Sequence, residues 1–122
     1  NIRVRSIIGR FLEHSRVFYF RTGNDESLYL SSADWMNRNM LRRVELTWPV
    51  EDVGLRQRVI DECLVAYLHD NVDAWSMDAH GHYTRVQPAK PRRSTSAATQ
   101  TTKPVKTQGA QAALMTLHGN KI

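Results

Sequence analysis

The segment from residue 17 to residue 30 constrains the fold of this chain more than any other part of the sequence. Val17-Phe18-Tyr19-Phe20 is β-branched and aromatic on both faces, which is typical of a strand covered on both sides. A polar stretch containing Gly23 and Asn24 follows, and then a second apolar run, Leu28-Tyr29-Leu30. Two such runs around a short polar turn predict a β-hairpin.

Two other stretches have the apolar spacing of helices. Before the hairpin, apolar residues recur at the i, i+3, i+4, i+7 and i+8 positions of one face, which predicts a helix over about residues 3 to 13: Val4, Ile7, Ile8, Phe11 and Leu12. After the hairpin, the helical spacing returns over about residues 53 to 69, and Asp52 is a candidate N-cap.

The remaining segments complete the predicted order of elements. Residues 31 to 40 have no clear period, which indicates a loop with a helical turn at about 34 to 40. Residues 43 to 48 alternate as a half-buried strand should, and Pro49 ends that strand. Residues 71 to 87 show no stable period. The order helix, strand, strand, strand, helix predicts a layered α/β domain.

Charge and composition separate the last part of the chain from the rest. Of the 122 residues, positions 1 to 87 hold 11 Lys or Arg and 12 Asp or Glu, whereas positions 88 to 122 hold 6 Lys or Arg and no acid. We expect this basic, low-complexity tail to be disordered, with a weak helix near residues 109 to 117. Because the positive excess lies in a tail, we do not expect nucleic acid as a partner.

The N-terminus and the lengths of the apolar runs indicate where in the cell the protein is expected. No run approaches the ~20 apolar residues that span a membrane, and no secretory signal is visible, so we expect no transmembrane segment. The first residue is Asn1 rather than Met, and we expect a piece of a longer chain. The expected location is the cytoplasm, with peripheral association with the inner membrane left open.

His14 and Arg16 stand where the predicted first helix meets the first strand. Side chains at i and i+2 of an extended segment point to the same side, so this pair could hold a phosphate group. Arginine supplies a forked, permanently charged donor, and histidine can donate to an oxygen or accept a proton. The alternative is a surface pair at a helix end, with His14 near the negative end of the helix dipole. Spacing alone favours this alternative.

Two more polar groups are candidates for anion binding. Ser31-Ser32-Ala33-Asp34 follows a strand, where hydroxyl groups and free amides can bind anions, although Ser and Asp also make turns and helix caps. Arg38, with Arg42 and Arg43, could contact a polyanion, or these arginines could form a solvated face or pair with Glu45 and neighbouring acids. His80, His82 and Asp78 are too few donors for a zinc site, and we expect no metal site in this chain.

Two long runs of this sequence read SIIGRFLEHSRVFYF, residues 6 to 20, and LYLSSADWMNRNMLRRVEL, residues 28 to 46. They resemble the C-terminal region of bacterial polyphosphate kinase. In that family a run close to SIVGRFLEHSR is followed by YLSSADWM, and then by RN and RRVE. The two runs occur here in the same order, and the similarity continues more loosely through the helix at 53 to 69.

The resemblance implies a fold like that of phospholipase D, an α/β sandwich used in two related copies. Residues 1 to 87 would be the C-terminal part of the second copy. In that superfamily a His-x-Lys pair is followed by a Gly-Ser-x-Asn turn. His14-Ser15-Arg16 and Ser31-Ser32-Ala33-Asp34 look like degenerate counterparts. Because Arg replaces Lys and Asp replaces Asn, phosphate binding is implied and phosphodiesterase activity is not.

The resemblance also implies a reaction. The family reversibly transfers the terminal phosphate of ATP to polyphosphate through a phosphorylated histidine in the preceding catalytic domain, and no residue of this chain matches that nucleophile. His14 matches the second active-site histidine, an acid or base, or a phosphate stabiliser. The implied substrate or ATP contacts are His14, Arg16, Ser31, Ser32, Asp34 and Arg38. Mg²⁺ would bind mainly outside this chain, which we expect to be inactive alone.

Partners and alternatives follow from the same resemblance. The expected partners are ATP or ADP, inorganic polyphosphate, the upstream domains of the same enzyme, and further copies in a homo-oligomer. Two other functions stay open. One is a non-catalytic module for polyanion binding or assembly, and the other is a phosphodiesterase of the phospholipase D type.

Overall fold

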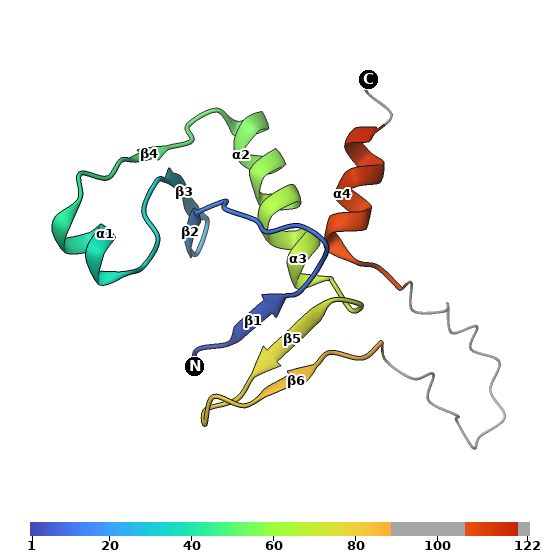
Figure 1. The fold of residues 1–122 in the computed structure, drawn as a ribbon. Helices are drawn as coiled ribbons and strands as arrows, with labels where there is room; N and C mark the ends of the chain where they lie inside the picture. Colours follow the sequence, from blue (N-terminus) through green and yellow to red (C-terminus); the bar gives the residue numbers. More distant parts are fainter. Residues whose placement is uncertain (89–106, 120–122) are drawn as a thin grey trace, which may run out of the picture. The chain divides into compact units, whose positions relative to one another are not determined.

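The structure is a computed structural model that describes residues 1–88 and 107–119, and these residues form a mixed α/β fold, as the sequence predicts (Figure 1). They divide into two compact units. One unit spans residues 11–65, and the other joins residues 1–10 to the described residues from 66 onward. Each unit has its own antiparallel three-stranded sheet.

The predicted hairpin is confirmed and organises the unit of residues 11–65. Strand β2 (Val17–Thr22) pairs antiparallel with β3 (Asp25–Ser31), and Thr22 lies opposite Asp25. Gly23 therefore opens a two-residue turn, and its φ of 62° is a conformation that glycine adopts without steric cost. The turn fixes the register of the pair, so it determines which side chains share each face of the sheet.

The two faces of this sheet differ in burial. One face carries Leu28, which is 2% exposed and lies opposite Tyr19. The other face carries Phe18, opposite Tyr29, and Phe20, whose ring meets the Tyr29 ring edge-on with centroids 6.3 Å apart. This aromatic face is less buried than the face that carries Leu28, and Phe20 on it is exposed.

The third strand of this sheet is shorter than the sequence predicts. A strand was expected over residues 43 to 48, but β4 covers Thr47–Pro49 and lies at the edge of the sheet, in the order β2-β3-β4. Pro49 lies opposite Tyr29 and is the last residue of the strand, so the strand ends at this proline as the sequence predicts. An edge strand tolerates proline because one side of its backbone needs no donor.

The helices between residues 34 and 69 follow the predictions closely. The expected turn near residues 34 to 40 is helix α1 (Asn37–Arg42). Helix α2 (Val53–Ile60) continues through a π-helical segment, η1 (Asp61–Val65), into α3 (Ala66–Leu68), as the sequence predicts for 53 to 69. Asp52 is the N-cap, because its Oδ1 accepts from the Leu55 amide at 2.8 Å.

The helix predicted for residues 3 to 13 is wrong. Val4–Ile7 form strand β1, which pairs antiparallel with β5 (Ala74–Met77) far along the chain. The Ile8 amide extends the ladder by donating to the Asp73 carbonyl at 2.9 Å. Leu12, part of the predicted apolar stripe, is 99% exposed. Long-range pairing has overridden a local helical pattern, as tertiary context often does.

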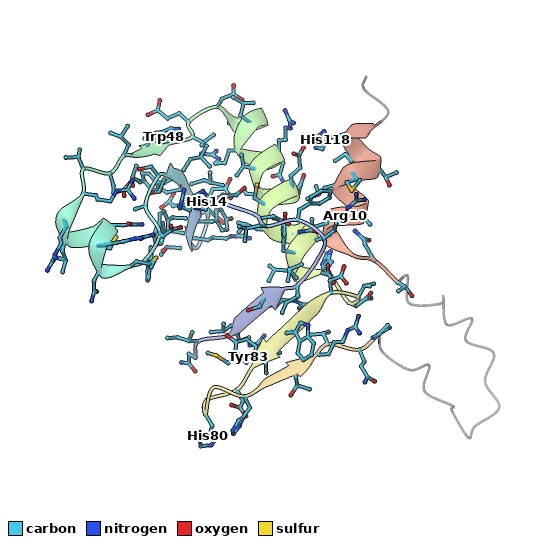
Figure 2. All side chains as sticks on the ribbon, in the orientation of Figure 1. Arg10, His14, Trp48, His80, Tyr83 and His118 are labelled. Atoms are coloured by element: carbon cyan, nitrogen blue, oxygen red, sulfur yellow. The ribbon has the colours of Figure 1, made fainter. Side chains whose placement is uncertain are left out.

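Strands β5 and β6 (Tyr83–Arg85) lie in a segment for which the sequence predicted no element. They pair antiparallel around a turn in which Asp78 Oδ1 accepts from the His80 and His82 amides, at 2.8 and 2.9 Å. The His82 ring lies 3.2 Å from the Asp78 carboxylate, and Figure 2 shows His80 at the tip of this turn. The described residues hold no group of three or more acidic, histidine or cysteine side chains suited to a metal ion.

The helix expected near residues 109 to 117 is α4 (Ala110–Gly119). Its first amide, that of Ala110, donates to Asp70 Oδ2 at 2.6 Å, and the Gln108 amide donates to Asn71 Oδ1 at 2.9 Å. This part of the tail is therefore bound to the unit of residues 1–10 and 66 onward. The disorder expected for the rest of the tail falls on residues 89–106 and 120–122, outside the described part. Among the helices described, none has the length and apolar character needed to cross a membrane.

Candidate functional site

The hairpin brings together His14, Arg16 and Asp34, which the sequence predicted as site residues. The ladder of β2 and β3 continues one step past its ends, because the Ser31 amide donates to the Arg16 carbonyl at 3.0 Å. The residues before β2 and those after β3 therefore lie at the same end of the sheet. This arrangement explains how two short motifs far apart in the sequence share one site.

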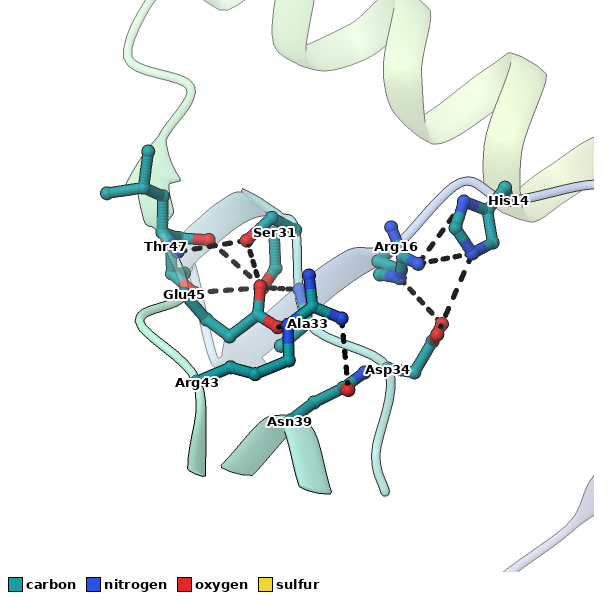
Figure 3. Close-up of polar contacts among 11 residues, drawn as sticks. His14, Arg16, Ser31, Ala33, Asp34, Asn39, Arg43, Glu45 and Thr47 are labelled. Atoms are coloured by element: carbon teal, nitrogen blue, oxygen red, sulfur yellow. Dashed lines mark hydrogen bonds and ion pairs between the residues drawn. The ribbon is translucent and has the colours of Figure 1, made fainter. Parts of the chain in front are cut away.

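Asp34 is the central member of this cluster (Figure 3). Arg16 Nε donates to Asp34 Oδ1 at 2.7 Å, and His14 Nε2 lies 3.6 Å from Asp34 Oδ2. Arg16 Nη2 also contacts both ring nitrogens of His14, with Nδ1 at 3.2 Å. The three side chains form a closed triangle of polar contacts.

The members of the triangle differ in exposure and charge. The His14 side chain is 74% exposed, that of Asp34 is 35% exposed, and that of Arg16 is 17% exposed. The hydrogen bond from Arg16 holds the pKa of the Asp34 carboxyl below its usual range, and the same bond raises the pKa of Arg16. Both groups are therefore charged at neutral pH, and His14 is the member most open to a ligand.

The hydroxyl groups of Ser31 and Ser32 bind neighbouring protein groups. Ser31 Oγ accepts from Thr47 Oγ1 at 3.0 Å and from the Ala33 amide at 3.1 Å. Ser32 Oγ accepts from the Leu46 amide at 3.0 Å and donates to Glu45 Oε2. These bonds join the end of β3 and the loop after it to the start of β4 and the residues just before it. They therefore fix the backbone of the loop that carries Asp34.

Arg38 stands apart from the triangle. It lies in the short helix α1, and its side chain is exposed. No hydrogen bond or ion pair joins its guanidinium to another described residue. Its guanidinium could receive an anion, although the structure does not bring it into contact with His14 or Arg16.

Glu45 is a polar residue at this end of the sheet that sequence reasoning did not single out as part of a site. Its Oε1 atom is buried and accepts no hydrogen bond, although Arg43 Nε lies 3.4 Å away. A buried carboxylate oxygen without a donor is costly. The available signal was the RRVE run, in which the sequence suggested only a surface pairing between Glu45 and the arginines.

A groove of about 550 Å³ opens beside these residues, over the aromatic face of the sheet. Trp35, which follows Asp34 directly, is 81% exposed and stacks on Phe18 with ring centroids 5.9 Å apart. The side chains that line the groove are mostly apolar, with polar groups along part of the wall: Phe18, Phe20, Tyr29, Ser31, Ala33, Trp35, Asn39, Met40, Arg43, Glu45 and Thr47.

The acidic side chains of this site do not fit a magnesium ion. Asp34 is bound to Arg16, and one Glu45 oxygen is taken by Ser32 while the other lies beside Arg43. Mg²⁺ prefers several free oxygen ligands in an octahedral arrangement. This chain offers no such set among its described residues.

Comparison with known proteins identifies the family. The family described as polyphosphate kinase C-terminal domain 2 matches residues 1–98. The polyphosphate kinase of Paraburkholderia phytofirmans is 56% identical over 94 residues, or 77% of this chain. That of Pseudomonas aeruginosa is 61% identical over 88 residues, or 72% of the chain. The crystal structure of polyphosphate kinase from Porphyromonas gingivalis matches 99% of the chain, with a TM-score of 0.75 and 36% identity.

The chain is short beside these relatives. It spans 14% of the Paraburkholderia phytofirmans protein, 13% of the Pseudomonas aeruginosa protein and 16% of the solved Porphyromonas gingivalis chain. The matched residues include the whole triangle of His14, Arg16 and Asp34. The family match over most of its length, together with the high identities, shows that this chain belongs to the polyphosphate kinase family, in its C-terminal domain 2.

Proposed function

We propose that this chain supplies the second active-site histidine of a polyphosphate kinase. In this reaction the bond between the terminal phosphorus of ATP and its bridging oxygen breaks, ADP leaves, and a histidine nitrogen upstream of this chain takes the phosphoryl group. A terminal oxygen of polyphosphate then attacks that phosphoryl group, the phosphorus–nitrogen bond breaks and frees the histidine, and the polyphosphate chain becomes one unit longer. The reverse sequence forms ATP from ADP.

The observation that carries this proposal is the exposed His14 ring beside the Arg16–Asp34 ion pair, within the family motif. Phosphoryl transfer depends on positioning and charge stabilisation more than on covalent variety. His14 would donate a proton or a hydrogen bond to a phosphate oxygen, a contribution of roughly 10²- to 10⁴-fold. Arg16, and further out Arg38, Ser31 and Ser32, are proposed contacts of the phosphate chain.

The partners and location belong to the same proposal. The partners are ATP or ADP, polyphosphate, the upstream domains of the enzyme, and further copies in a homo-oligomer. The chain alone would bind phosphate without turnover, because the nucleophile lies elsewhere. Residues 1 to 87 would be the C-terminal part of a second phospholipase D-like domain, and the enzyme would work in the cytoplasm.

The decisive experiment replaces His14 in the complete polyphosphate kinase that contains this sequence. ATP formation from polyphosphate and ADP is measured for wild type, for His14→Ala and for His80→Ala, which removes an exposed histidine on the turn between β5 and β6. We expect a loss of roughly 10²-fold or more for His14→Ala and wild-type rates for His80→Ala. A wild-type rate for a folded His14→Ala enzyme would refute the assignment.

The same preparation tests the two alternatives. Salt-sensitive polyphosphate binding without any turnover by the complete protein would indicate a non-catalytic binding module. Hydrolysis of a model phosphodiester would indicate a phosphodiesterase, a function disfavoured by the arginine at position 16.

A further inference from the structure

We propose that Asp34 is a positioning residue for His14 and Arg16 and does not itself contact the phosphate groups. This inference rests on the proposed function, and it changes one part of the sequence prediction, which placed Asp34 among the phosphate contacts.

The two oxygens of Asp34 face different partners. Oδ1 accepts from Arg16 Nε at 2.7 Å, and Oδ2 lies 3.6 Å from His14 Nε2. A carboxylate that contacts a guanidinium with one oxygen and an imidazole with the other sets the distance and the angle between these two groups. His14 and Arg16 lie two residues apart at the entry to β2, where local backbone structure alone leaves their side chains several rotamers.

Asp34 has a fixed place from which to act. The residue before it, Ala33, is buried, and its amide donates to Ser31 Oγ at 3.1 Å. The Asp34 carbonyl accepts from the Met36 amide at 2.7 Å. Ser31 is itself joined to Thr47 of β4. The carboxylate therefore projects from a loop that hydrogen bonds tie to β3 and β4, whereas the His14 side chain is mostly exposed.

The charge of Asp34 gives a test that separates positioning from substrate contact. A carboxylate repels a phosphate group, and it also draws the Arg16 guanidinium toward itself. Removing that negative charge should leave phosphate binding unchanged or make it tighter. Removing the positioning contact should slow the chemical step, because a misplacement of about 1 Å can cost about 10²-fold in rate. A residue that binds substrate would instead raise KM when it is replaced.

The test uses Asp34→Asn in the complete polyphosphate kinase, with steady-state kinetics of ATP formation from ADP and polyphosphate. We expect kcat to fall roughly 10- to 100-fold, with KM for polyphosphate unchanged or lower. Asp34→Glu, which keeps the charge and can reach Arg16, should recover part of kcat. Asp78→Asn is the matched control, because that carboxylate faces His82 in the turn between β5 and β6, and its kinetics should be those of wild type.

A second measurement does not depend on turnover. It is NMR of proteins isotopically labelled at histidine. The chemical shifts of the His14 ring should change in Asp34→Asn and stay unchanged in Asp78→Asn. The chemical shifts of the His82 ring should change in Asp78→Asn and stay unchanged in Asp34→Asn. A general loss of structure would move the signals of every histidine. Less-than-additive effects on kcat when Arg16→Lys is combined with Asp34→Asn would show that the two residues act as one unit.

The outcomes separate this inference from the proposed function. If the wild-type complete enzyme forms no ATP from polyphosphate, the proposed function fails, and the histidine signals still decide whether Asp34 positions His14. If the enzyme is active, the inference is overturned by a wild-type kcat in Asp34→Asn, by a raised KM with unchanged kcat, or by unmoved His14 signals.

Discussion

At the scale of single residues, the carboxylates of this chain organise its local structure. Asp34 joins the two halves of the candidate site, and Asp70 fastens the C-terminal helix. Asp70 is fully buried, and its Oδ1 accepts from the Val72 and Asp73 amides at 2.9 and 2.7 Å. One side chain therefore shapes the loop before β5 and receives the first amide of α4.

We expect Asp70→Asn to destabilise the chain by about 1–3 kcal/mol, because buried amides lose a charged acceptor. Burial acts to raise the pKa of Asp70, but donation from the Ala110, Asp73 and Val72 amides outweighs it and lowers the pKa overall. The stabilisation is therefore complete above the unfolded pKa of about 3.9 and is lost as the pH falls through the folded pKa.

Urea unfolding of wild type and Asp70→Asn between pH 7 and pH 2.5 measures this effect. The difference in unfolding free energy should be largest at neutral pH and should shrink below about pH 4. Asp25→Asn, at the exposed start of β3, is the control and should change stability little at any pH. A difference that grows on acidification would contradict the role given to Asp70.

Arg16 should control the titration of Asp34. In the wild-type chain the bond from Arg16 favours the charged carboxylate and keeps its pKa low. Arg16→Ala removes that bond, and we expect the pKa of Asp34 to rise toward about 3.9. Carboxyl NMR titration of wild type and variant measures it. An unchanged Asp34 titration would mean that the ion pair is not formed in solution.

At the scale of elements, the sequence correctly predicts those that depend on interactions between residues close together in the chain. The hairpin and the helix after Asp52 are set by nearby residues, a glycine turn and a capping carboxylate, and both are confirmed. Strand β1 depends on pairing with β5, a distant segment, which a local pattern does not carry. Strands β5 and β6 form a local hairpin, but their segment has no stable apolar period that would predict it. The apolar spacing of residues 3 to 13 fits a helix, yet the first part of that segment completes a sheet.

The turn of the hairpin gives an element-scale prediction. Gly23→Ala should destabilise the chain by about 1–2 kcal/mol, because φ at this position is 62° and an L-residue is strained there. A Cβ at Gly23 would meet no atom within 4 Å beyond its two neighbouring residues, so the cost comes from the local backbone conformation and not from a clash with another part of the chain. Chemical denaturation measures it.

Gly119→Ala is the matched control for this turn. A Cβ there also meets nothing within 4 Å, but Gly119 lies at the end of α4 and has no positive φ. We expect no loss of stability for Gly119→Ala. Equal effects at the two glycines would show that backbone strain at Gly23 is not the cause.

At the scale of the whole chain, the described residues bury few apolar side chains. The buried apolar residues are Leu28, Ala33, Ala74 and Ala110, whereas large side chains such as Trp35 are exposed. The sequence predicted only part of the site. Its motifs indicated His14, Arg16 and Asp34 as site residues. The contact between Arg16 and Asp34, and the burial of one Glu45 oxygen, depend on folding of the sheet and could not be predicted from the motifs.

The aromatic groove gives the prediction at this scale. We expect the chain to bind an apolar fluorescent dye, because an open apolar patch of this kind attracts apolar ligands. Trp35→Ser should lower dye binding several-fold, since Trp35 covers Phe18 within the groove. Leu117→Ser, which removes an exposed apolar side chain from α4, should change it little. Equal losses in both variants would contradict a groove-centred site.

The proline in β4 has a consequence for how the sheet of residues 11–65 can grow. The Val50 amide donates inward to the Leu28 carbonyl, so the backbone nitrogen of Pro49 faces outward, and it carries no hydrogen. This border of the sheet lacks a donor that an incoming strand would need. The opposite border, along β2, is six residues long and contains no proline. The proline therefore makes the β4 border a poorer template than β2 for pairing with a further strand.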